Sequence, residues 1–199
     1  MLYDHLDRAP RVHPDAVVAA GAVVSGDVEI GPGCRILHGA VVSAEGGPIT
    51  LGEHCIVMEN AVLRASASDP LHVGDHTLIG PLASVSGARI DPEVFVATGV
   101  RIFNGAVVGR GSEVRINAVV HLRTRLEEGS VVPIGWVAVG DPARILPPDA
   151  HDEIWEVQRE LDFPGYVFGL DRDTPDLMVQ LTERYGRHLG RHAEDHRLD

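Results

Sequence analysis

The stretch from Ile90 to Val120 reads IDPEVFVATGVRIFNGAVVGRGSEVRINAVV, and it decides the fold. An aliphatic residue returns at every sixth position, and a small residue follows four positions after most of them. The same period runs through the aliphatic residues Val12, Val18, Val24, Ile30, Ile36, Val42, Leu51, Val57, Leu63, Val73, Ile79, Val85, Ile90, Val96, Ile102, Val108, Val114, Val120, Leu126 and Val132. The two-residue alternation of an ordinary strand cannot keep small residues in phase over so many repeats. The sequence therefore predicts a parallel β-helix, an all-β solenoid.

The repeat also predicts how the chain is organised. Three six-residue segments make one triangular coil, so residues 12–147 predict about seven coils. Residues 1–11 form an N-terminal lead-in, and residues 148–199 form a C-terminal extension whose apolar spacing predicts α-helices. The segments 43–50 and 65–72 break the period and contain turn-forming residues, so we expect loops there. Loops that interrupt a regular solenoid often carry function.

Composition limits the function classes. The net charge is −12, with 17 basic and 29 acidic residues, which argues against nucleic acid or an anionic membrane surface as a partner. The sequence shows no signal-peptide pattern and no apolar run of membrane-spanning length, so we expect a cytoplasmic protein. Cys34 and Cys55 fall on the small inward position, where reduced cysteines fill the core in place of alanine.

The repeat, its two interruptions and the ending VGDPAR at residues 139–144 together resemble the γ-class carbonic anhydrase-like proteins of the hexapeptide-repeat superfamily. The five-residue segment 85–89 also matches a short repeat of that family in length and place. The resemblance covers about residues 10–147. It implies that the β-helix is left-handed and that the chain assembles as a homotrimer.

The resemblance further implies a zinc site with three histidines, and this sequence departs from it. The family's Gln-Asp-Asn motif reads MEN at residues 58–60, and the histidine expected six residues after the Gln is Arg64. The other two histidine positions hold Pro81 and Ser86. None of these is an ordinary zinc ligand. We therefore expect no zinc cofactor and no zinc-dependent hydration of carbon dioxide.

The repeat register predicts which residues replace that site. His38, Glu59 and Pro81 share one outward position in successive coils, and Ser43, Arg64 and Ser86 share the next. We predict a polar cluster of His38, Glu59 and Arg64, within a subunit or across an interface, with ligand-binding residues Ser43, Glu45, Asn60 and Ser86 beside it. In a functional interpretation Glu59 or His38 is a base and Arg64 holds a small anionic ligand. In a structural interpretation, which we favour, an ion pair sets the register of the trimer.

The remaining histidines suggest two weaker alternatives. His121 points outward from a later coil and is the candidate base of an acetyl-CoA-dependent acyltransferase. His188, His192 and His196 recur at every fourth position of a predicted helix, a spacing that suits zinc or nickel. Because Gly190 weakens that helix and the segment is terminal, we predict no metal site there and keep these three histidines only as an alternative.

Three functional hypotheses follow from the sequence. The first is a γ-carbonic anhydrase-like homotrimer without zinc that acts as a scaffold or binds a small ligand. The second is a hexapeptide acyltransferase that uses acetyl-CoA. The third is a non-metal enzyme that uses Glu59, Arg64 and His38. We favour the first.

Overall fold

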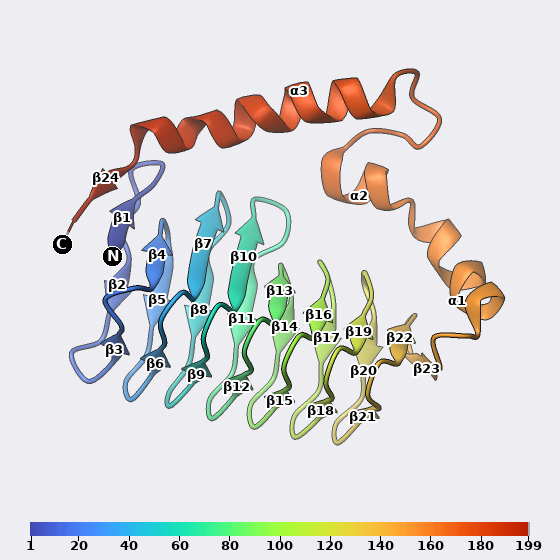
Figure 1. Cartoon of the computed structure of the whole chain (residues 1–199), viewed down its shortest axis with the longest axis horizontal. Helices are drawn as coiled ribbons and strands as arrows, with labels where there is room; N and C mark the ends of the chain where they lie inside the picture. Colours follow the sequence, from blue (N-terminus) through green and yellow to red (C-terminus); the bar gives the residue numbers. More distant parts are fainter. Residues whose placement is uncertain (199) are drawn as a thin grey trace.

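The computed structural model describes residues 1–198 and is a left-handed parallel β-helix with C-terminal helices (Figure 1). Three parallel sheets form the sides of the solenoid, and each coil contributes one strand to every side. Seven complete coils run from β2 to β22, and β1 adds one further parallel strand before them. The prediction of the fold class is confirmed, and the stacking extends into residues that we expected to be a lead-in.

The side that carries the candidate site is a ten-stranded sheet, which we call the long sheet. Its parallel strands are β1 (Leu2–Asp4), β4 (Val23–Ser25), β7 (Val41–Glu45), β10 (Val62–Ser66), β13 (Ser84–Ser86), β16 (Arg101–Ile102), β19 (Val119–Val120) and β22 (Val137–Val139). Two antiparallel strands close its ends, namely β23 (Arg144–Leu146) on β22 and β24 (His196–Arg197) on β1.

The other two sides are seven-stranded sheets. One contains β2 (Arg11–Val12), β5 (Val28–Ile30), β8 (Ile49–Leu51), β11 (Leu71–Val73), β14 (Arg89–Ile90), β17 (Val107–Val108) and β20 (Arg125–Leu126). The other contains β3 (Val17–Val18), β6 (Arg35–Ile36), β9 (Ile56–Val57), β12 (Leu78–Ile79), β15 (Phe95–Val96), β18 (Glu113–Val114) and β21 (Val131–Val132).

The core is the column of aliphatic side chains that the six-residue period predicts. Ile36, Val57, Ile79 and Val96 follow one another in this column and are fully buried. The small residues fill the corners between the large ones, and Cys34 and Cys55 are buried free thiols among them. Burial of this continuous column is the main stabilising term of the solenoid.

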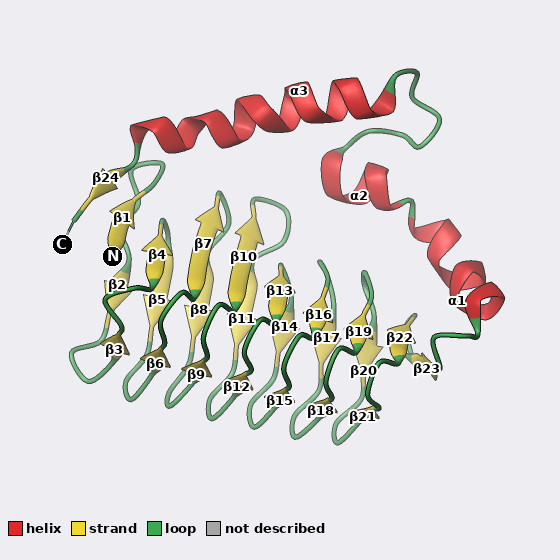
Figure 2. Cartoon of the chain, viewed as in Figure 1, coloured by secondary structure: helices red, strands yellow, loops and turns green. Residues whose placement is uncertain are grey.

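The two predicted loops are shorter than expected. Strand β7 continues to Glu45 and β10 continues to Ser66, so only residues 46–48 and 67–70 lie outside strands. The two extensions pair with each other in register, with Ser66 opposite Glu45. An interruption in one coil is thus stabilised by backbone hydrogen bonds to the interruption in the next. Two longer strands result at this place in the long sheet (Figure 2).

The C-terminal extension returns along the solenoid. It contains α1 (His151–Gln158), the 3₁₀ helix η1 (Arg159–Leu161), α2 (Phe163–Phe168), α3 (Leu177–Leu189) and the 3₁₀ helix η2 (Gly190–Glu194). Asp162 adopts a left-handed conformation that separates η1 from α2, and Pro164 lies in the first turn of α2, where proline fits. Helix α3 runs from the last coils back toward the first, outside the long sheet (Figure 1). No helix within residues 1–198 is long and apolar enough to cross a membrane.

Candidate functional site

The candidate site lies where the extended strands β7 and β10 meet the end of α3. Ser43 and Glu45 are two residues apart on β7, so both point outward, while Ala44 between them is buried in the core. The Ser43 hydroxyl donates a hydrogen bond to Glu45 Oε1 (2.7 Å), and Arg64 Nη2 on β10 donates to the same oxygen (3.3 Å). The Glu45 side chain is only 5% exposed, so these contacts stabilise a buried carboxylate.

The C-terminal segment contributes the other partners of Glu45. His192 Nε2 lies 3.0 Å from Glu45 Oε2, and His192 Nδ1 lies 2.8 Å from Asp195 Oδ2. Asp195 Oδ1 accepts a hydrogen bond from His5 Nδ1 at 2.6 Å. His5 follows β1 and is 2% exposed. We call the chain of contacts through Glu45, His192, Asp195 and His5 the clasp, because it joins β7 to both termini of the described chain.

The electrostatics of the clasp follow from its alternating charges. Burial alone would raise the pKa of Glu45, but the hydrogen bond from Ser43 and the charges of His192 and Arg64 outweigh it and hold that pKa below its usual value. Burial would lower the pKa of His192, but Asp195 and Glu45 raise it overall. Both ring nitrogens of His192 face carboxylate oxygens, so the ring must be protonated to donate to both. The clasp is therefore an imidazolium held between two carboxylates.

The clasp also contains three possible metal ligands, which we tested against its geometry. Donor atoms of His5, His192 and Asp195 lie within 4.8 Å of one another. The two imidazole rings are stacked, with centroids 4.3 Å apart and planes inclined by 18°. The ring lone pairs lie in these nearly parallel planes and do not converge on one point, as zinc ligation requires. The observed distances are those of hydrogen bonds, which this network explains without an ion.

Arg64 connects the clasp to a roof formed by α2 and α3. Arg64 Nη1 donates a hydrogen bond to the Tyr185 hydroxyl (3.2 Å). The Tyr185 ring packs edge-on against Phe168 and is parallel to the His188 ring. Helix α2 is held by the Tyr166 hydroxyl, which donates to the buried Asp69 (2.6 Å). Burial and this hydrogen bond raise the pKa of Tyr166 to about 12. The roof is thus attached to the solenoid by tyrosine hydroxyls.

A cavity of about 230 Å³ lies between the roof and the long sheet. It is lined by Glu45, Arg64, Ala65, Ser66, Ser86, Phe103, Asn104, Phe163, Val167, Phe168, Tyr185 and His188. A neighbouring cavity of about 430 Å³ shares six lining residues with it, namely Glu45, Ser66, Val167, Phe168, Tyr185 and His188. Arg64 is the one cation lining the smaller cavity among residues 1–198, apart from the titratable His188. Burial and Arg191 lower the pKa of His188, which favours its neutral form.

Similarity to known proteins agrees with the fold. The chain is 31% identical over 159 residues to gamma carbonic anhydrase 1, mitochondrial, of Arabidopsis thaliana, an alignment that covers 77% of this chain and 56% of that protein. It is 28% identical over 145 residues to the carnitine operon protein CaiE of Escherichia coli, which covers 73% and 71%. The chain is γ-carbonic anhydrase-like. It spans a little over half the length of the plant protein. No family model matches it.

Solved structures similar to the γ-carbonic anhydrase-like chain establish its fold. A putative acetyltransferase of Bacillus cereus has a TM-score of 0.56 at 21% identity, over 80% of this chain and 91% of that one. LpxA, a UDP-N-acetylglucosamine acyltransferase of Bacteroides fragilis, has a TM-score of 0.54 at 15% identity, over 87% and 89%. At such low identity the similarity shows a shared solenoid and does not assign a reaction.

The predicted site residues of the γ-carbonic anhydrase-like chain are only partly brought together. Arg64 lies in register with Ser43 and Ser86, as the repeat predicted. His38 and Glu59 also lie in successive coils at one corner, where the Asn60 amide donates a hydrogen bond to the His38 carbonyl. Both side chains are exposed. Within residues 1–198 no contact joins them to Arg64, whose carboxylate partner is Glu45. The expected cluster therefore does not form within one chain, and its formation across a subunit interface stays a prediction.

Asn60 has a role at a turn of the solenoid. It adopts a left-handed backbone conformation, with φ of 58°, and its side chain lies against Gly39 of the preceding coil. A Cβ at Gly39 would meet Asn60 Oδ1 at 2.2 Å, so this close approach requires glycine. Ligand binding by Asn60 stays a prediction that the geometry of the corner does not favour.

The structure also places the four histidines of the two alternative hypotheses. Helix α3 ends at Leu189, His192 lies in η2 and His196 lies in β24, so the predicted helical face that carries all three histidines was wrong. Gly190 begins the change to a 3₁₀ turn. His121 is half-buried against Phe103, and its Nδ1 has no hydrogen-bond partner among the described residues. Burial lowers the pKa of His121.

Four contributors to the clasp and to the contacts of Arg64 were missed from the sequence, namely His5, Tyr185, Asp195 and His192 in its role as a partner of Glu45. The apolar spacing of residues 177–189 did place Tyr185 on the inner face of a helix. His5 and Asp195 gave no signal as partners of each other, because 190 positions separate them in the sequence.

Proposed function

We propose that this chain forms a zinc-independent homotrimer that binds a small ligand beside Arg64 and does not hydrate carbon dioxide. The observation that carries the proposal is the environment of Arg64. Its guanidinium is held between Glu45 and Tyr185, at the position that the family resemblance assigns to a zinc histidine. A guanidinium stays protonated and offers no lone pair to a metal.

The other two positions support the same proposal. Pro81 has no donor atom in its side chain, and Ser86 is a poor zinc ligand as a neutral hydroxyl. The residues present therefore do not fit the metal, and we assign no step to a metal-bound water. That the chain uses no other resident cofactor is part of the same proposal.

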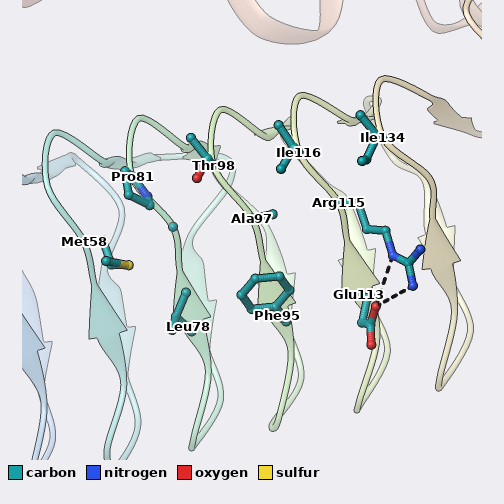
Figure 3. A pocket seen from close by; sticks show the side chains of 11 residues that line it. Met58, Leu78, Pro81, Phe95, Ala97, Thr98, Glu113, Arg115, Ile116 and Ile134 are labelled. Atoms are coloured by element: carbon teal, nitrogen blue, oxygen red, sulfur yellow. Dashed lines mark hydrogen bonds and ion pairs between the residues drawn. The ribbon is translucent and has the colours of Figure 1, made fainter.

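Assembly is supported by an apolar groove on the β3–β21 side of the solenoid (Figure 3). The groove has a volume of about 500 Å³, and Phe95, Ile116 and Ile134 line it with 44%, 44% and 63% of their surface exposed. The Glu113–Arg115 ion pair lies at its edge. Exposed apolar surface of this kind is suited to burial between subunits. This groove is our candidate for part of the trimer interface.

Metal analysis tests the proposal. We expect untagged protein, purified without chelators, to contain far less than stoichiometric zinc by plasma mass spectrometry, and to show no carbon dioxide hydration in stopped flow. The triple variant Arg64→His, Pro81→His, Ser86→His is the matched control, because it restores the three ligand types that the family resemblance implies. Stoichiometric zinc in the wild-type protein, retained after dialysis, would contradict the proposal.

An acetyl-CoA-dependent acyltransferase is the second candidate. The observation that favours it is His121, a half-buried imidazole whose pKa is lowered by burial, which favours the neutral form that can accept a proton. Calorimetry with acetyl-CoA tests it directly. If acetyl-CoA does not bind at millimolar concentration, the acyltransferase hypothesis is refuted. If His121→Ala leaves both acetyl-CoA binding and any transferase activity intact, His121 is not the catalytic base.

A cytoplasmic location stays a prediction. The name of the Arabidopsis relative places that protein in mitochondria. Fractionation of cells that express the native gene tests the location of this one.

A further inference from the structure

We propose that the cavity of about 230 Å³ beside Arg64 binds a small monocarboxylate with a short apolar or aromatic tail, a molecule of the size of benzoate. The inference rests on the proposed function in one respect, namely that no zinc occupies this position. It adds the chemical class of the ligand and its orientation, with the carboxylate toward the sheet and the tail toward the roof.

The carboxylate end is set by Arg64. A guanidinium carries five N–H donors, and the contacts with Glu45 and Tyr185 use only part of this capacity. The Arg64 side chain is 42% exposed and borders the cavity, so its other donors are accessible to a ligand. Ser86 lies beside Arg64 in register, and Asn104 lines the same cavity. A cation flanked by neutral donors is the arrangement that receives a carboxylate.

Glu45 does not exclude an anion from this cavity. Its carboxylate already accepts hydrogen bonds from Ser43, Arg64 and His192, and the raised pKa of His192 keeps a positive charge on its far side. His188, which also lines the cavity, is favoured in its neutral form. The guanidinium that faces a ligand in this cavity is that of Arg64.

The tail end is set by aromatic side chains of the roof and of the loop after β16. Phe163 and Phe168 pack edge to face, with ring centroids 5.9 Å apart, and Phe168 packs in the same way on Tyr185. Phe103 and Val167 complete this apolar part of the cavity. Edge-to-face arrangements of this kind accept one more ring or a short alkyl chain. The cavity has room for one ring or a short alkyl chain beside the carboxylate, and it adjoins the cavity of about 430 Å³.

Calorimetry of the full-length protein with benzoate, benzamide and acetate tests the inference. Benzamide keeps the shape and loses the charge, and acetate keeps the charge and loses the tail. We expect both to bind at least about tenfold more weakly than benzoate, the factor expected for loss of one charge-assisted hydrogen bond or of one apolar group. Equal binding of benzoate and benzamide would overturn the inference.

Two variants locate the site. Arg64→Gln should weaken benzoate binding at least about tenfold, while Arg89→Gln, an exposed arginine that donates to Asp91 on another side, should leave it unchanged. Ser86→Leu keeps the charge but fills the floor of the cavity, so it should abolish binding. Unchanged binding in Arg64→Gln or Ser86→Leu, with both variants folded by circular dichroism, would show that benzoate binds elsewhere and would overturn the inference.

Zinc content and subunit mass, measured in the same samples, separate the two proposals. A zinc-free trimer that does not bind benzoate would refute the ligand assignment and leave the proposed function standing. Stoichiometric zinc, with benzoate binding that is lost after chelation, would refute both.

Discussion

At the scale of single residues, the behaviour of this site depends on one buried carboxylate. Glu45 is 5% exposed and accepts hydrogen bonds from Ser43, Arg64 and His192. Arg64, in contrast, keeps almost half of its surface in water. The stability of the site should therefore depend more on removal of the charge of Glu45 than on removal of the charge of Arg64.

We predict that Glu45→Gln lowers the free energy of unfolding by about 2 kcal/mol, because it leaves the cations of Arg64 and His192 without their shared anion. Glu93→Gln is the matched control, since Glu93 pairs with Arg110 at the exposed surface and should cost at most about 0.5 kcal/mol. Urea unfolding at pH 6 measures both. Equal losses would show that the buried network contributes no more than a surface ion pair.

At the scale of elements, the clasp determines how the roof is held. No residue of α3 is buried, so little apolar burial attaches this helix to the sheet. Its end is fixed instead by the pairing of β24 with β1 and by the charged contacts of His192 and Asp195. Tyr185 adds a hydrogen bond along the helix. The position of α3 should therefore respond to pH more strongly than the solenoid does.

The direction of that response follows from the pKa shifts. The raised pKa of His192 contributes stability that is fully present below its ordinary value of about 6.5 and is lost as the pH rises through the raised value. The lowered pKa values of Glu45 and Asp195 contribute stability that is present above about 4 and is lost as the pH falls through the lowered values. The clasp should be most stable between about pH 4.5 and 6.5.

Comparison of wild type with His192→Asn over pH 5 to 9 checks this expectation. The variant should be less stable near pH 6, and the difference should shrink toward pH 9 as the wild-type imidazolium deprotonates. His76→Asn serves as a control, because His76 lies outside the clasp and stacks on His54 near a corner of the solenoid. Proton NMR of the His192 ring should report a pKa above the ordinary value. A constant stability difference across this range would contradict the charged clasp.

At the scale of the whole molecule, the proposed assembly concerns one of the two sides of the solenoid that α3 does not cover. Phe95, Ile116 and Ile134 are exposed around the apolar groove of the β3–β21 side. Met178 on α3 is as exposed as Ile134, at 63%, but belongs to another surface. Substitutions of Ile134 and Met178 therefore distinguish a specific interface at the groove from a general effect of exposed apolar surface.

We predict that Ile134→Asp converts the proposed trimer to smaller species, because it would bury an unpaired charge in the proposed interface. Met178→Asp should leave the assembly unchanged. Light scattering coupled to size exclusion, at matched protein concentration, measures the mass of both. A trimer that survives Ile134→Asp, or a wild-type protein that is monomeric, would contradict this assignment of the groove.

The sequence by itself determined the fold, the register and the column of core residues, because burial in a β-helix repeats with a fixed period that a single chain records. For the same reason it placed Arg64 beside Ser43 and Ser86. Only the tertiary structure decided that Arg64 pairs with Glu45 and not with Glu59, and that His5, His192 and Asp195 complete the network. The physical reason is that these contacts depend on the path of a non-repeating C-terminal segment, whose return to the first coils leaves no periodic pattern in the sequence. The fold is thus encoded locally and repeatedly, while the site is made by contacts between residues far apart in the chain.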